Sequence, residues 1–207
     1  MNEKKFSIFM LCHLGIMAIL AILDLINGVL TIASSMKGTG LTQVSSLNMA
    51  IAFTYLLTVI AIFFGISYII QGYSKQSSDC YKLFILMVSV ANCCTLVAFM
   101  IALKNLSAIP EIPDNKTFIS LGTVMLIAKI VLLLLLWTGK DLGKIRTWCV
   151  WVIILVIDLG IGLLFITPAT FWFYRVLFVV SRLAIDLTIA LSIHGKYSDK
   201  EARGRIQ

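Results

Sequence analysis

The sequence predicts an all-α fold: a polytopic integral membrane protein built as a bundle of six transmembrane helices. The 207 residues are 60% hydrophobic and only 13% charged, whereas an ordinary soluble domain is about 25% charged. The apolar residues lie in runs long enough to cross a hydrocarbon core, which takes ~20 residues per helix. These runs do not alternate with a period of two, as the strands of a membrane barrel do.

The six runs account for most of the chain, so we expect one transmembrane domain over residues 1–207. Backbone polar groups have no water to bond inside lipid, and each run is therefore expected to be helical. The expected spans are residues 6–34, 47–70, 81–103, 118–137, 148–166 and 172–194, and residues 195–207 are expected to form a short basic tail. No stretch is left that could fold as a separate soluble domain.

The first span follows Lys4 and Lys5. Its apolar run is much longer than the core of a cleaved signal, which is about 7–15 residues, and we expect an uncleaved helix. A glycine-containing link, residues 36–40, separates it from the second span. Gly65 inside the second span permits close approach of a neighbouring helix, and Gly72 follows its last turn, as glycine commonly does at a helix end.

The third and fourth spans flank the longest loop, which contains Pro110 and Pro113. The fifth and sixth spans are joined by a short link around Pro168. Glycine followed shortly by lysine closes the second, fourth and sixth spans, which suggests three helical hairpins in the same, parallel orientation. The alternative is that any six-span chain with ordinary Gly-Lys helix ends has this pattern, and the sequence leaves both interpretations open.

Lysine and arginine are distributed unequally between the two sides of the expected bundle. One side carries eleven of them: Lys4, Lys5, Lys75, Lys82, Lys140, Lys144, Arg146, Lys196, Lys200, Arg203 and Arg205. The other side carries four: Lys37, Lys104, Lys116 and Arg175. The positive-inside rule therefore predicts a multi-pass protein of the cell membrane with both termini in the cytoplasm. The net charge of +7 favours contact with anionic lipid of the bilayer, and its scatter over short segments argues against nucleic acid as a partner.

Five ionisable residues lie well inside the spans: Asp24, Lys129, Asp158, Arg182 and Asp186. Each costs ~2.5–3.5 kcal/mol at the centre of a helix on insertion scales. We therefore expect them to face the interior, where they are paired, neutralised or hydrated. Arg182 and Asp186 are four residues apart and share a helix face with Arg175. Lys129 is left to meet Asp24 or Asp158, and one carboxylate has no obvious partner, with Asp24 the best candidate for a working group.

Neutral polar side chains accompany these charges. Asn27 continues a polar stripe from Asp24 towards the outer end of the first span, and Tyr55, Thr58 and Asn92 could join it. The functional interpretation is a cavity that binds a small molecule or ion, and the alternative is hydrogen bonding that only holds helices together. The candidate binding residues are Asp24, Asn27, Asn92, Lys129, Asp158, Arg175, Arg182 and Asp186.

Signs of a cofactor, a metal site or a soluble-type catalytic site are lacking. The five cysteines and two histidines do not cluster at metal-ligand spacing, so we expect no metal and no cofactor. None of the nucleophile, phosphate-loop or dinucleotide motifs is found, and catalysis would need an intramembrane site that such motifs do not mark. Asn105 and Asn115 begin Asn-x-Ser/Thr sequons, whose use depends on an origin that the sequence leaves open.

Two functions are favoured over an enzyme, a channel or a membrane sensor. The first is a small transporter or substrate-capturing permease subunit with an interior polar site. The second is a non-catalytic subunit or assembly factor of a larger membrane protein complex, whose charges would pair with a membrane-protein partner. The two differ in one structural respect: a transporter should gather its charges around an internal cavity, and a subunit should direct some of them outward.

Overall fold

The computed structural model describes residues 3–38, 43–71, 79–106, 113–138, 142–164, 183, 185–197 and 204. This part of the chain forms the helices α1 (Glu3–Gly38), α2 (Gln43–Ile70), α3 (Asp79–Leu106), α4 (Pro113–Trp137) and α5 (Lys144–Leu164), followed by a sixth helix over residues 185–197. No strand occurs among the described residues. The all-α prediction is confirmed.

Four of the helices are long and apolar enough to cross a membrane. Their apolar windows are Ile8–Ser34, Ser46–Ile70, Asp79–Lys104 and Ile119–Trp137, which match the first four expected spans. The expected fifth span largely coincides with α5. The expected sixth span, 172–194, lies mostly outside the described residues, and its C-terminal part falls within helix 185–197. The chain therefore has the helices of a membrane protein.

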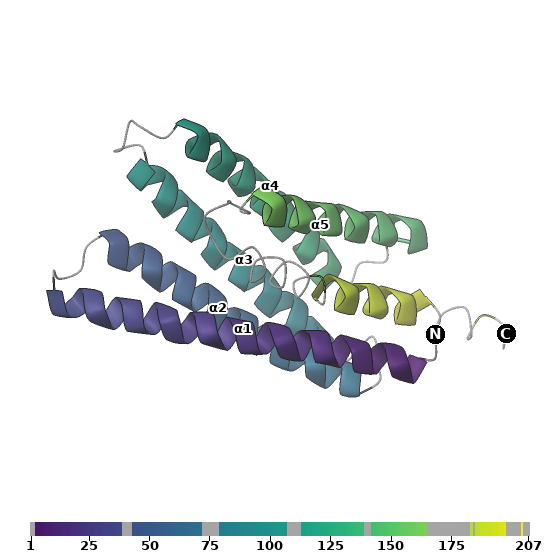
Figure 1. Cartoon of the computed structure of the whole chain (residues 1–207). Helices are drawn as coiled ribbons and strands as arrows, with labels where there is room; N and C mark the ends of the chain where they lie inside the picture. The colour runs from purple at the N-terminus through teal and green to yellow at the C-terminus, as the bar shows by residue number, and fades with distance from the viewer. Residues whose placement is uncertain are drawn as a thin grey trace.

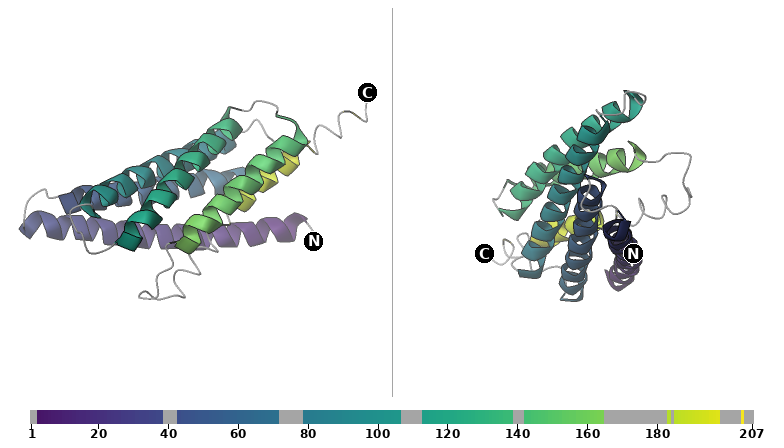
Figure 2. Two further views of the ribbon diagram at one scale, coloured as in Figure 1. Left: turned by 90° about the horizontal axis from the view of Figure 1, so that it is seen from above. Right: turned by 90° about the vertical axis from the view of Figure 1, so that its left-hand side faces the viewer.

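Successive helices run in alternating directions, and each of α1 to α4 packs against the next helix along the chain. In Figure 1 the starts of α1, α3 and α5 lie towards one end of the bundle, together with the end of helix 185–197. The left-hand view of Figure 2 shows the same elongated arrangement, and the right-hand view looks at the bundle from one end. This alternation positions residues from distant parts of the sequence at matching depths in the bundle.

The main core lies between α1, α2, α3, α4, α5 and helix 185–197. Leu14, Phe84, Ile154 and Ile189 are completely buried there. Gly65 of α2 permits the close packing, because a Cβ atom at this position would lie 3.1 Å from Cε2 of Phe84. Helix 185–197 therefore belongs to the same core as the N-terminal helices.

The outer faces of the helices are strongly apolar. Ile19, Phe63 and Val124 are 61%, 66% and 64% exposed, and they come from α1, α2 and α4 in turn. Large exposed apolar areas of this kind are unfavourable in water and suit contact with lipid chains. The interior of the bundle and its outer surface are thus both apolar, and polar side chains are few in either.

Candidate functional site: a polar cavity beside a buried ion pair

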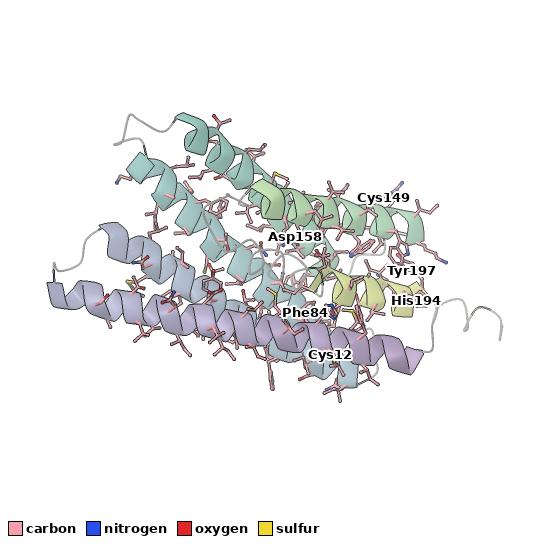
Figure 3. The ribbon with its side chains drawn as sticks, in the orientation of Figure 1. Cys12, Phe84, Cys149, Asp158, His194 and Tyr197 are labelled. Carbon is pink, nitrogen blue, oxygen red and sulfur yellow. The ribbon has the colours of Figure 1, made fainter. Side chains whose placement is uncertain are left out.

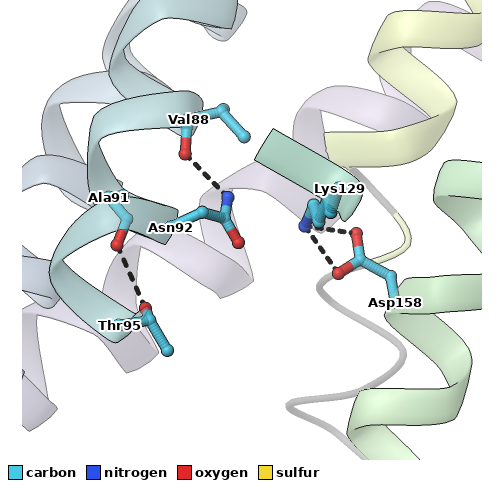
Figure 4. Close-up of polar contacts among 6 residues, drawn as sticks. All are labelled: Val88, Ala91, Asn92, Thr95, Lys129 and Asp158. Atoms are coloured by element: carbon cyan, nitrogen blue, oxygen red, sulfur yellow. Dashed lines mark hydrogen bonds and ion pairs between the residues drawn. The ribbon is translucent and has the colours of Figure 1, made fainter. Parts of the chain in front are cut away.

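The centre of the bundle contains an ion pair between α4 and α5. Nζ of Lys129 donates hydrogen bonds to both carboxylate oxygens of Asp158, at 2.5 Å to Oδ1 and 2.7 Å to Oδ2 (Figure 4). The side chains are only 3% and 5% exposed. Lys129 was expected to meet Asp24 or Asp158, and its partner is Asp158. The two charges offset each other's cost of burial through this direct contact.

The pair is positioned by the inner faces of its two helices. Leu126 and Leu133 flank Lys129 on α4 and are completely buried, which places the lysine on the same inward stripe three or four residues from each. Asp158 lies on the buried stripe of α5 beside Ile154 and Ile161. Both charges therefore lie on the inward faces of their helices, away from the exposed apolar surface.

A cavity of about 70 Å³ adjoins the ion pair. A water molecule needs roughly 10–15 Å³ of such volume, so the cavity has room for a few waters, or for an ion with part of its hydration shell. Every described helix contributes to its wall, through Met17, Ala21, Thr54, Tyr55, Thr58, Ala61, Val88, Ala91, Asn92, Thr95, Lys129, Asp158 and Ile185. This cavity is the candidate site because residues from all six described helices line it, several of them polar.

The neutral polar groups in the wall are arranged as acceptors. The hydroxyls of Thr54, Thr58 and Thr95 donate to backbone carbonyls one turn earlier, at 3.0, 2.7 and 3.0 Å. Nδ2 of Asn92 likewise donates to the carbonyl of Val88 at 2.7 Å (Figure 4). Because a hydroxyl has a single hydrogen and two lone pairs, each threonine can present only lone pairs to the cavity. These three hydroxyls and the carboxylate of Asp158 therefore favour a cation or another hydrogen-bond donor.

Three of the remaining predicted site residues lie elsewhere. Asp24 is half-buried on α1 and does not line the cavity, although Ala21, one turn earlier, does. Asn27 is exposed. Asp186 is fully buried, and its backbone carbonyl accepts a hydrogen bond from Nε1 of Trp151 at 2.8 Å. The structure thus brings together Asn92, Lys129 and Asp158 and leaves Asp24 and Asn27 outside the cavity.

The two predicted arginines, Arg175 and Arg182, fall outside the described residues. The expected pair between Arg182 and Asp186 therefore stays a prediction.

Two cavity residues were not singled out from the sequence, Thr54 and Thr95. Their signal is the spacing: Thr54 lies one turn before Thr58, and Thr95 lies three residues after Asn92. Each pair shares a helix face, so polar residues one turn apart in an apolar span could have marked the lining. The polar stripe of Asp24 and Asn27 on α1 was expected to line the cavity, but α2 and α3 supply most of the polar wall instead.

The histidines and cysteines are dispersed. Nδ1 of His13 lies 3.0 Å from the carbonyl oxygen of Phe9, and His194 is exposed on helix 185–197 (Figure 3). All five cysteines are free thiols. Among the described residues, no group of three or more His, Cys, Asp or Glu side chains could hold a metal ion.

Comparison of the chain with protein-family models, with curated proteins and with solved structures gives no match.

Proposed function

We propose that the chain is a small multi-pass transporter of the cell membrane, with six spans and both termini in the cytoplasm, that moves a small cation through the cavity beside Lys129 and Asp158. The observation that carries the proposal is the buried ion pair in direct contact with a polar cavity. A purely structural pair gains nothing from an adjoining polar space, and a salt bridge shielded on all sides by apolar side chains would hold the helices equally well.

The burial of the charged side chains favours a transporter over a non-catalytic subunit. Lys129, Asp158 and Asp186 are all buried within this chain, at 3%, 6% and 0% exposure. A subunit that pairs its charges with a partner would expose most of them on the outer surface, whereas among the described charges within the spans only Asp24 is half-buried. These three side chains are therefore placed to contact a substrate inside the bundle and not a partner protein outside it.

The size and chemistry of the cavity define the class of substrate. About 70 Å³ is too small for most metabolites and adequate for an alkali cation or ammonium. Such a cation would compete with the ammonium group of Lys129 for the carboxylate of Asp158, and oxygens of Thr54, Thr58 and Thr95 would complete its coordination. The neutral pair would then carry an extra positive charge, which is strongly unfavourable in a low-dielectric interior.

Release of a proton from Lys129 removes that extra charge. The site holds one positive charge opposite the single carboxylate of Asp158, so a cation that enters replaces the positive charge of the ammonium group. Entry of the cation is therefore coupled to loss of a proton, and the transport cycle is an exchange of a monovalent cation for a proton. Asp158 is the shared binding group, and Lys129 is the proton carrier.

The test is cation-driven proton movement in vesicles. The purified chain is reconstituted into liposomes that contain a pH-sensitive dye, and inward gradients of Na⁺, K⁺ and NH₄⁺ are imposed in separate runs, with empty liposomes as the baseline for NH₃ permeation. We expect a pH change above that baseline for at least one cation, and its loss in Lys129→Met and Asp158→Asn. Lys104→Met, at the exposed end of α3 and outside the cavity wall, is the matched control and should retain activity.

Two results would contradict the proposal. One is the absence of cation-dependent proton movement for all three cations in vesicles with verified insertion, which would leave the non-catalytic subunit as the remaining hypothesis. The other is full activity in Lys129→Met, since the coupling requires the proton on that lysine.

A further inference from the structure

A second pocket lies at the end of the bundle where α3 and α5 begin and α4 and helix 185–197 end (Figure 1). Its volume is about 60 Å³, room for roughly four to six water-sized groups, which is the scale of a phosphate with its oxygens. The described residues that line it are Tyr81, Lys82, Leu135, Leu136, Trp137, Leu142, Thr147, Ser192, Ile193 and Lys196. It shares no residue with the central cavity.

The charge of this pocket is positive. Two of the described lining residues are lysines, Lys82 and Lys196, and none is acidic. They come from helices far apart in the sequence; Lys82 is exposed and Lys196 is half-buried, with its Nζ 5.7 Å from the centre of the Tyr197 ring. Both positive charges attract an anion that enters the pocket.

The floor of the pocket is ordered by buried hydroxyls. Oγ1 of Thr147 donates to the carbonyl of Gly143 at 2.9 Å and lies 2.8 Å from the hydroxyl of Tyr197. Ser192, which is 2% exposed, donates to the carbonyl of Ile189 at 2.6 Å. Gly143 adopts a positive φ of 81° immediately before α5, a conformation that glycine takes without strain. The pocket is therefore a built concavity and not a gap between mobile side chains.

The outer wall of the pocket is apolar and faces the surroundings of the bundle. Trp137 and Leu135 are 42% and 38% exposed, and both belong to the last turn of the apolar window Ile119–Trp137. Tryptophan is enriched where the hydrocarbon core meets the headgroups. The pocket thus lies where a spanning helix leaves the hydrocarbon, with buried hydroxyls in its floor, two lysines in its wall and an apolar approach on the lipid side.

We propose that this pocket binds the headgroup phosphate of an anionic phospholipid, between the ammonium groups of Lys82 and Lys196. The acyl chains lie along the exposed side of α4 beside Leu135 and Trp137. Basic pockets between membrane helices bind such headgroups, and the apolar wall selects a lipid over a free anion, which would leave that surface uncovered. The proposal does not depend on transport through the central cavity.

The test is lipid binding measured by native mass spectrometry on the full chain in detergent. Phosphatidylglycerol, phosphatidylcholine and inorganic phosphate are added in separate titrations. We expect phosphatidylglycerol to bind at a saturable site and to be displaced by neither of the others. In the double variant Lys82→Gln/Lys196→Gln its affinity should fall by about 30-fold, since each lysine near an anionic headgroup contributes about fivefold.

The matched control is Lys144→Gln/Arg146→Gln. It removes the same two positive charges at the same end, from exposed positions on the first turn of α5 that do not line the pocket, and its affinity should stay within about twofold of the native protein. An equal loss in both double variants would reduce the effect to general charge attraction and overturn the proposal. Displacement of the lipid by inorganic phosphate would overturn it in favour of a free anion.

A measurement on the native chain covers the case in which the first double variant does not fold. Lipid brominated in the acyl chain should quench Trp137 when its headgroup is phosphatidylglycerol and much less when it is phosphatidylcholine. This difference should disappear in Trp137→Phe. Equal quenching by the two lipids would contradict the proposed site.

Discussion

Removal of one member of the central ion pair should destabilise the protein strongly, and removal of both should not. Lys129→Leu leaves the carboxylate of Asp158 buried without its ammonium partner. The N–O distances of 2.5 and 2.7 Å correspond to an attraction of about 6 kcal/mol at an effective dielectric constant of about 20. Part of this attraction is offset by desolvation of the two charges, and single removals of buried partners cost about 3–5 kcal/mol.

The double variant Lys129→Leu/Asp158→Leu has no buried charge left to compensate. We expect its stability to lie within about 1 kcal/mol of the native protein, because well-packed apolar replacements of buried pairs are often neutral or stabilising. For a chain of this length a loss of 3–5 kcal/mol lowers the midpoint by about 6–20 °C. Each midpoint is measured as the temperature at which half the protein is lost from the monodisperse peak on size exclusion after heating in detergent.

The control for the lysine is Lys104→Leu, the same change at an exposed position, for which a shift below about 1 kcal/mol is expected. The reasoning is refuted if the double variant loses as much stability as the sum of the two single variants, because additivity would mean that the two groups do not interact.

Two further predictions concern packing and topology. Gly65→Ala should cost about 1–3 kcal/mol, because its Cβ atom would press on the ring of Phe84 at 3.1–3.2 Å and overpacking of this kind forces rigid groups to shift; thermal midpoints should show this loss and no loss for Gly15→Ala, which meets nothing within 4 Å. In a cysteine-free background, a membrane-impermeant thiol reagent added outside cells should label a cysteine at Thr39 and spare one at Lys200, and the opposite labelling would reverse the orientation.

The sequence by itself determines the helices. The length of the apolar runs, the need to satisfy every backbone polar group within lipid and the glycine and proline punctuation are local properties, and the first four expected spans match the apolar windows of α1 to α4. The sequence also identifies the charged residues whose burial in the membrane costs free energy, because a charge within an apolar run is easily recognised. Lys129 and Asp158 could therefore be predicted to lie in the interior.

Only the tertiary structure decides which of these groups meet. In a soluble protein the apolar face of each helix reveals its inward side, but here the interior and the lipid-facing surface are both apolar, and the sequence carries little signal for helix rotation. The choice of Asp158 over Asp24 as the partner of Lys129 depends on the rotation at which α4 and α5 pack, where Met125 lies against Gly160. The contribution of Thr54 and Thr95 to the cavity depends on the rotation of α2 and α3, where Phe84 packs against Gly65. The rotation of each helix is set by how its side chains pack against the neighbouring helices, and the sequence of one helix alone does not determine it.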